Sequence, residues 1–233
     1  MPRVHFDNLK LNQAIVEVRY PKGYLYWDVC GHCIREINQR SGNKIDLREL
    51  QAGASVLKFT EEKGLEARFG VRNMFVTGTR LRNVNALKEY GPLIYDVLRE
   101  QIQFEQVSRV GFRVFFVLEK ESEDDAVAFV DSLKLYSVQA DRFARFGDTI
   151  HAPEATITLS TGRERTRISI KPASRGDIDD PNAEFDEFAP RHAVLTDVDF
   201  SVEDVAAKDL QLEEFIYRSF GKVKDNISTL LNP

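Results

Sequence analysis

The sequence has little of several features that mark whole classes of protein. Only two cysteines, Cys30 and Cys33, occur among its 233 residues, which is too few for a disulfide framework and is typical of a reducing compartment. No window approaches about 18 uncharged apolar residues, and the first residues lack the apolar stretch of a secretory signal. These absences predict a cytoplasmic protein without a membrane partner.

The common phosphate-binding and nucleophile motifs are also missing. There is no Gly-x-x-x-x-Gly-Lys loop, no Gly-x-Gly-x-x-Gly and no Gly-x-Ser-x-Gly. This argues against the usual nucleotide-hydrolase, dinucleotide and esterase classes, although a dispersed active site leaves the question of an enzyme open. The four histidines are scattered and only one cysteine pair is present, whereas structural zinc needs about four ligands. We predict neither a metal nor a cofactor.

The composition is that of a compact fold. Hydrophobic residues make up 42% and charged residues 30% of the chain, which excludes bulk disorder. The formal net charge is -5, so no global attraction draws the protein to nucleic acid. A role with nucleic acid would need a local basic face.

Hydrophobic periodicity predicts an α+β fold, with antiparallel sheets and flanking amphipathic helices. Helices are expected at 24–40, 83–103, 126–136 and 209–231. Strands are expected at 12–20, 54–59, 65–71, 74–77, 107–118, 156–159, 166–170 and 193–200. The apolar stripe of the last helix predicts either a core element or a partner surface.

The charged run Glu119–Asp125 is the best internal boundary. It divides the chain into an N-terminal half, 1–120, and a C-terminal half, 121–233, which form either two similar halves or one continuous domain. Both halves follow a plan of strands, hairpin and amphipathic helix, without a residue-level repeat. The Pro- and Asp-rich stretch 173–191 has no periodicity and predicts an irregular excursion.

Arginines recur at a spacing of two or four along three groups of strands. Because alternate residues of a strand point to one face, each set shares a side. If the strands share a sheet, that face is basic and could hold phosphate groups, bases or an acidic partner. The alternative is that these arginines decorate a solvent face, paired with Glu66 or Glu164. The set is Arg68, Arg72, Arg109, Arg113, Arg163, Arg165 and Arg167.

The string Cys30-Gly31-His32-Cys33 is identical to the redox motif of protein disulfide isomerases. It resembles the centre of thioredoxin-like proteins, in which a helix N-terminus stabilises the thiolate. Here the helical pattern begins before Trp27, which places both cysteines inside the helix. Redox exchange and buried structural cysteines therefore both remain open as interpretations.

Three blocks carry a second resemblance: LNQAIVEVRYP, VSRVGFRVFFVLE, and the late strand with the terminal helix. They are similar to a sporadically distributed bacterial family of uncharacterised proteins of about this size. That family has a Val-Glu-x-x-Arg-Phe-like early strand, an Arg-x-Gly-Leu-Arg-Tyr-like central strand and a late Asp-x-Asp strand. Here Arg109 to Arg113 and Asp197 to Asp199 stand for the last two, although Val114 replaces the tyrosine. The resemblance implies an accessory or defence-associated gene and no activity.

The sequence leads to two hypotheses about function. The first is a non-enzymatic interaction or assembly module that self-associates into a homo-oligomer or docks a protein partner through a sheet edge or the terminal helix. The alternative is an RNA- or nucleotide-binding protein that uses the basic face, including a ferredoxin-like endoribonuclease in which His151 or His192 works with arginine.

Overall fold

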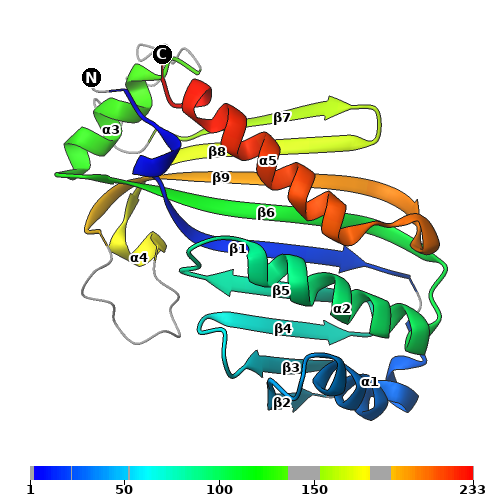
Figure 1. Cartoon of the computed structure of the whole chain (residues 1–233). Helices are drawn as coiled ribbons and strands as arrows, with labels where there is room; N and C mark the ends of the chain where they lie inside the picture. Colours follow the sequence, from blue (N-terminus) through cyan, green and yellow to red (C-terminus); the bar gives the residue numbers. More distant parts are fainter. Residues whose placement is uncertain (1–2, 22, 52, 136–152, 179–189, 233) are drawn as a thin grey trace, which may run out of the picture.

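The computed structural model describes residues 3–21, 23–51, 53–135, 153–178 and 190–232. These residues form an α+β fold, as predicted, around a nine-stranded antiparallel sheet of order β2-β3-β4-β5-β1-β6-β9-β8-β7 (Figure 1). The strands are β1 (Lys10–Arg19), β2 (Ile45–Gln51), β3 (Ala54–Phe59), β4 (Leu65–Gly70), β5 (Asn73–Thr79), β6 (Gln106–Lys120), β7 (Ala155–Thr161), β8 (Glu164–Ser174) and β9 (His192–Ala206). The α-helices are α1 (Tyr26–Arg40), α2 (Asn85–Ile102), α3 (Glu123–Ser132), α4 (Arg175–Ile178) and α5 (Leu212–Leu230).

The sheet repeats one order of strands on both sides of its centre. β1 and β6 pair in the middle; β5, β4, β3 and β2 follow outward from β1, and β9, β8 and β7 follow outward from β6. In each half the first strand is therefore central and the last strand lies beside it. β7 takes the place that β3 has in the first half. Within the described ranges, no strand of the second half corresponds to β2.

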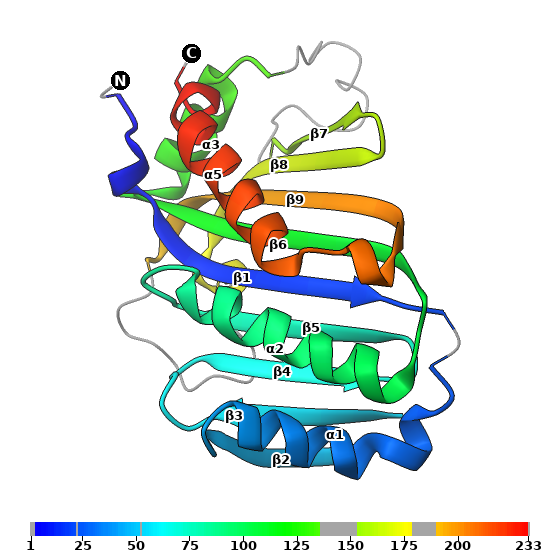
Figure 2. The same cartoon turned by 45° about the vertical axis from the view of Figure 1, so that its right-hand side comes forward.

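The long helices cover one face of the sheet, as Figures 1 and 2 show for α1, α2 and α5. Alternate residues of the central strands point toward these helices and are buried, among them Val16 of β1 and Phe112 of β6. A Cβ added at Gly91 of α2 would lie 3.5 Å from Ile216 of α5 and 4.0 Å from Val16. One main core therefore fills the space between the sheet and the helices.

Local sequence signals set several of these boundaries. The charged run between the halves ends β6 at Lys120 and begins α3 at Glu123, where the Ser122 hydroxyl caps the helix by accepting the Asp125 N–H at 3.1 Å. Pro92 lies inside α2. The apolar stripe of α5 is core, with Ile216 and Val223 buried.

We use the name open face for the side of the sheet opposite α1, α2 and α5. Among the described residues, the helix packed on that side is α4, whose Ile178 contacts a small apolar cluster at one end of the sheet, formed with Val117, Ala173, Ala193 and Leu195. This end of β8 and α4 occupies 173–178 of the stretch predicted to be irregular; positions 179–189 lie outside the described residues. Most of the remaining open face carries polar side chains.

Candidate functional site

The centre of the open face holds a cluster of arginines and acids, which we call the central charge cluster: Glu17, Arg19, Arg109, Arg113, Asp197 and Asp199. Arg109 of β6 lies between two carboxylates from neighbouring strands. It donates to Glu17 of β1 and, from Nη2, to both carboxylate oxygens of Asp199 of β9, at 2.8 and 3.0 Å. The side chain of Glu17 is only 9% exposed and that of Arg109 only 18%, so solvent screens this network weakly.

Gly111 makes room for this arrangement. It lies directly opposite Glu17 in the β1–β6 register, and the Arg109 guanidinium crosses over it. A Cβ at this position would overlap Arg109 Nη1 and lie 2.9 Å from Cζ. Arginine 109 therefore reaches Glu17 because residue 111 has no side chain.

A second arginine makes a matching pair further along β6. Arg113 donates from Nε and Nη2 to the two oxygens of Asp197, at 2.8 and 2.5 Å, which is a bidentate geometry. Its Cζ also lies 4.6 Å from the ring centroid of Phe115. The nearby carboxylates raise the pKa of Arg113, chiefly through the hydrogen bond to Asp197. The carboxylates of Asp197 and Asp199 neutralise much of the positive charge that the sequence predicts on this face.

The acids of the cluster were not among the predicted site residues. In the sequence, Glu17 belongs to the early block of the resemblance and Asp197 and Asp199 to its late Asp-x-Asp motif. Their meeting with Arg109 and Arg113 depends on the register of β1, β6 and β9. Burial raises the pKa of Asp199, and the nearby Arg109 charge acts against that rise. The three blocks that carry the bacterial-family resemblance thus each contribute to one cluster.

The other predicted arginines surround this cluster with fewer contacts. Arg165 of β8 pairs with Glu203 at 3.1 Å, and Arg163 in the β7–β8 turn donates to the Asp204 carbonyl at 3.4 Å. Arg167 lies opposite Asp199 in the β8–β9 register, and Arg68 lies on β4. Glu164 does not pair with these strand arginines.

Glu164 instead accepts hydrogen bonds from the helix side. Its carboxylate binds Lys222 at 2.8 Å and Arg218 at 2.7 Å, both on α5. The hydrogen bond from Lys222 is the main cause of its lowered pKa. Glu164 therefore connects α5 to β8, and the paired arginines of the open face bind Glu17, Asp197, Asp199 and Glu203 instead.

The open face is therefore mixed in charge rather than uniformly basic. Within the described part of the chain, Arg68, Arg72 and Arg167 are exposed and make no ion pair. Arg72, in the β4–β5 turn, lines a cleft of about 560 Å³. That cleft also contains Arg19, Asn73 and the exposed ring of Tyr24, a combination suited to small anions.

Of the two histidines proposed for an endoribonuclease, His192 does not join the cluster. His192 begins β9 opposite Lys120 and Ser174, and strand alternation turns it to the side opposite Asp197. His151 lies outside the described residues. No three His, Cys, Asp or Glu side chains of the described ranges come together as a metal site.

The two cysteines lie inside α1, several residues after its start at Tyr26. Cys33 is fully buried and Cys30 partly buried. Burial is the main cause that raises the pKa of the Cys33 thiol to about 12, which gives roughly a thousandfold less thiolate than its ordinary value of 9.0. His32 is exposed and accepts a hydrogen bond from Arg35 Nη2 at 2.6 Å. This environment favours a structural role for Cys33 over thiol exchange.

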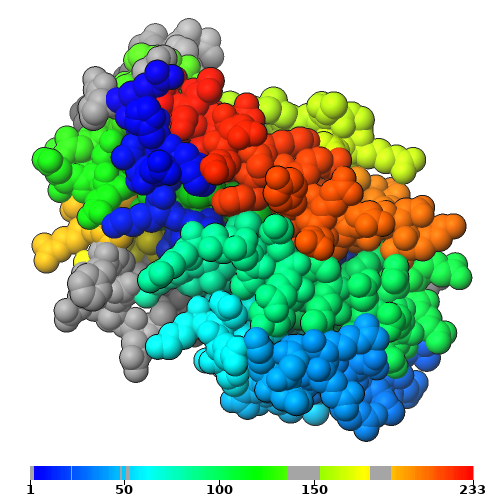
Figure 3. All heavy atoms as spheres, viewed as in Figure 1, coloured from blue at the N-terminus to red at the C-terminus, as the bar shows by residue number. Residues whose placement is uncertain are grey.

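β7, at one edge of the sheet, differs from the charged open face in its composition. Its seven residues, Ala-Thr-Ile-Thr-Leu-Ser-Thr, contain no charge, and Leu159 is 54% exposed. Figure 3 shows the β7–β8 hairpin at the rim of the molecule, beside α5. Sequence reasoning predicted the hairpin but not that β7 would be an outermost strand.

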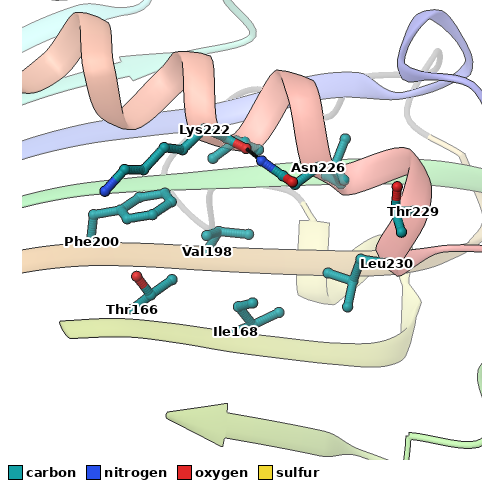
Figure 4. Close-up of a pocket in the computed structure, with 10 residues that line it drawn as sticks. Thr166, Ile168, Val198, Phe200, Lys222, Asn226, Thr229 and Leu230 are labelled. Atoms are coloured by element: carbon teal, nitrogen blue, oxygen red, sulfur yellow. Dashed lines mark hydrogen bonds between the residues drawn. The ribbon is translucent and has the colours of Figure 1, made fainter. Parts of the chain in front are cut away.

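An apolar groove runs beside this edge, between α5 and the helix side of β8 and β9. Its volume is about 560 Å³. Figure 4 shows Ile168, Val198 and Phe200 on the strands and Lys222 and Leu230 on α5, all lining the groove. Ile168 pairs with Ile157 of β7, so the apolar surface continues from the groove to the edge strand.

No protein-family model matches this chain, and no match to a curated protein was found. Within the described residues, no helix has the length and apolar character needed to cross a membrane.

Proposed function

We propose that this protein is a non-enzymatic interaction module that takes up an additional β-strand along β7. The observation that carries the proposal is the position of this strand. In the first half β2 covers the corresponding strand, β3, whereas the described residues place no strand beside β7. Backbone groups on an open strand edge can pair with another chain.

The chemistry of the edge supports the same proposal. Leu159 and Ile157 lie on the helix side, next to the apolar groove under α5. A strand added there would extend the sheet and bury this apolar surface as well. The bacterial-family resemblance adds a biological setting to the proposal, an accessory or defence-associated assembly.

Leu159→Lys tests the proposed edge. A lysine at this exposed position should block strand addition, because pairing would bury its charge against the added strand. The matched control is Leu47→Lys on β2, the opposite edge, where Leu47 is 47% exposed. The tagged proteins are purified gently from the cells in which the protein is native, and bound chains are identified by native mass spectrometry.

We expect one defined protein, either another chain or a second copy, to accompany wild type and Leu47→Lys and to be lost from Leu159→Lys. Circular dichroism checks that all three proteins are folded. The proposal is wrong if the same chains accompany all three proteins, or if none accompanies any of them.

A second candidate is binding of RNA or another polyanion on the open face. The observation that favours it is the set of exposed arginines without ion pairs among the described residues: Arg68, Arg72 and Arg167. Arg68→Glu combined with Arg167→Glu should weaken binding of a single-stranded RNA about tenfold or more at low salt. Fluorescence anisotropy measures it, with Arg35→Glu on the helix side as the control. An absence of binding by wild type at low salt would eliminate this candidate.

A further inference from the structure

The two outer strands of the sheet are protected to different degrees. β2 carries Asp46 and Glu49 and has a register shift between Leu47 and Glu49. Charges and bulges of this kind keep sheet edges from pairing with other chains. β7 contains no charged residue and pairs with β8 without a register shift. Of these two edges, β7 is therefore the one suited to accept a strand.

We infer that the strand that β7 accepts is β7 of a second copy of this chain, paired antiparallel about a two-fold axis through Thr158. This inference rests on the proposed role of the β7 edge and identifies its occupant. Thr158 is the middle residue of the strand Ala155–Thr161. An axis there pairs all seven residues, because residue 155 meets 161 of the second copy and residue 157 meets 159.

The two residues on either side of Thr158 alternate in the same way, because Ile157 and Leu159 are aliphatic and Thr156 and Ser160 carry hydroxyls. Ile157 of each copy would face Leu159 of the other on the helix side, next to the two apolar grooves. Thr156 would face Ser160 on the open face. Aliphatic and hydroxyl pairs of this kind stabilise antiparallel strands, and the strand sequence needs no partner of different composition.

The charges that flank β7 are complementary in the same register. Glu154, just before the strand, would lie opposite Gly162 of the second copy and therefore beside its Arg163. Both residues are exposed, and Glu154 accepts hydrogen bonds only from the Thr156 and Ser169 hydroxyls among the described residues. The two-fold axis creates this contact between opposite charges twice. The assembly would join two nine-stranded sheets edge to edge.

Charge substitution at Thr158 tests both the occupant and the axis. Thr158 is exposed, so a charged residue there leaves the fold of one copy intact. In the proposed dimer, Thr158→Lys places two lysines directly opposite each other, and Thr158→Asp places two aspartates there. Each variant should raise the dimer dissociation constant on the order of a hundredfold. Light scattering should show a dimer for wild type and a monomer for each variant.

Mixing the two variants supplies the decisive measurement. Lysine from one copy then faces aspartate from the other, so native mass spectrometry should find a dimer containing one of each. Leu50→Lys on the β2 edge is the control and should remain a dimer. If Thr158→Lys and Thr158→Asp each remain a dimer as the wild type does, the proposed axis through Thr158 is wrong.

If the wild type is a monomer, the inference of a dimer is wrong. The result for Leu159→Lys then decides whether the proposed function is wrong as well. If Leu159→Lys still removes a different protein from the native assembly, the edge accepts a strand but not from a second copy. If no chain depends on the edge, both proposals fail.

Discussion

Arg109→Ala is expected to lower the free energy of unfolding by about 3 kcal/mol, the lower end of the cost of removing one partner from a buried ion pair. The substitution leaves Glu17 and Asp199 without their shared guanidinium, and their side chains are only 9% and 23% exposed. Urea unfolding monitored by circular dichroism measures the change. The control is Arg165→Ala, whose more exposed pair with Glu203 should contribute less than about 1 kcal/mol.

The cost of losing Arg109 should depend on pH. Burial already raises the pKa of Asp199, and the Arg109 charge limits that rise, so the substitution should raise this pKa further. When the pKa of a carboxyl is higher in the folded than in the unfolded state, the protein becomes less stable as the pH rises from the unfolded pKa to the folded pKa. It becomes more stable again as the pH falls. The difference from wild type should therefore be larger at about pH 7 than at about pH 5. An equal difference at both would show that Asp199 is not the group left unpaired.

Gly111→Ala is expected to destabilise the protein by about 2 kcal/mol, although alanine ordinarily suits a strand better than glycine. The added Cβ occupies the space of the Arg109 guanidinium and pushes it away from Glu17 and Asp199. In the Arg109→Ala background the same change should instead stabilise by about 0.5 kcal/mol, because only the conformational advantage over glycine remains.

A double-mutant cycle on residues 109 and 111 measures this reversal of sign by urea unfolding. The nearest heavy atoms around the added Cβ all belong to Arg109, so the cycle isolates one contact. Equal costs in both backgrounds would mean that Gly111 is required by the backbone of β6 and not by the arginine that crosses it.

Much of the fold could be predicted from the spacing of hydrophobic residues along the sequence. The long segments with a clear pattern, now β1, β6, α2 and α5, were predicted within a few residues of their observed bounds. β2 was missed. Its sequence, Ile-Asp-Leu-Arg-Glu-Leu-Gln, alternates poorly because a register shift interrupts it, and its position at an edge leaves it little buried surface.

The candidate sites were less predictable because they depend on pairing between distant strands. The spacing of the arginines correctly gives the face of each strand to which Arg109 and Arg113 belong, since the side-chain period is fixed. It does not give the strand that lies beside them. Only the β6–β9 register brings Arg113 close to Asp197 and Arg109 close to Asp199.

The seam between β1 and β6 has a consequence for the kinetics of folding. Val16 pairs with Val76 of β5 and with Phe112 of β6, far along the chain in both cases, whereas β3, β4 and β5 are joined by short turns. Closing a long loop costs more conformational entropy than closing a hairpin, and contacts between distant residues slow folding. We expect the hairpins on either side to form early and the closure of the seam to limit the rate.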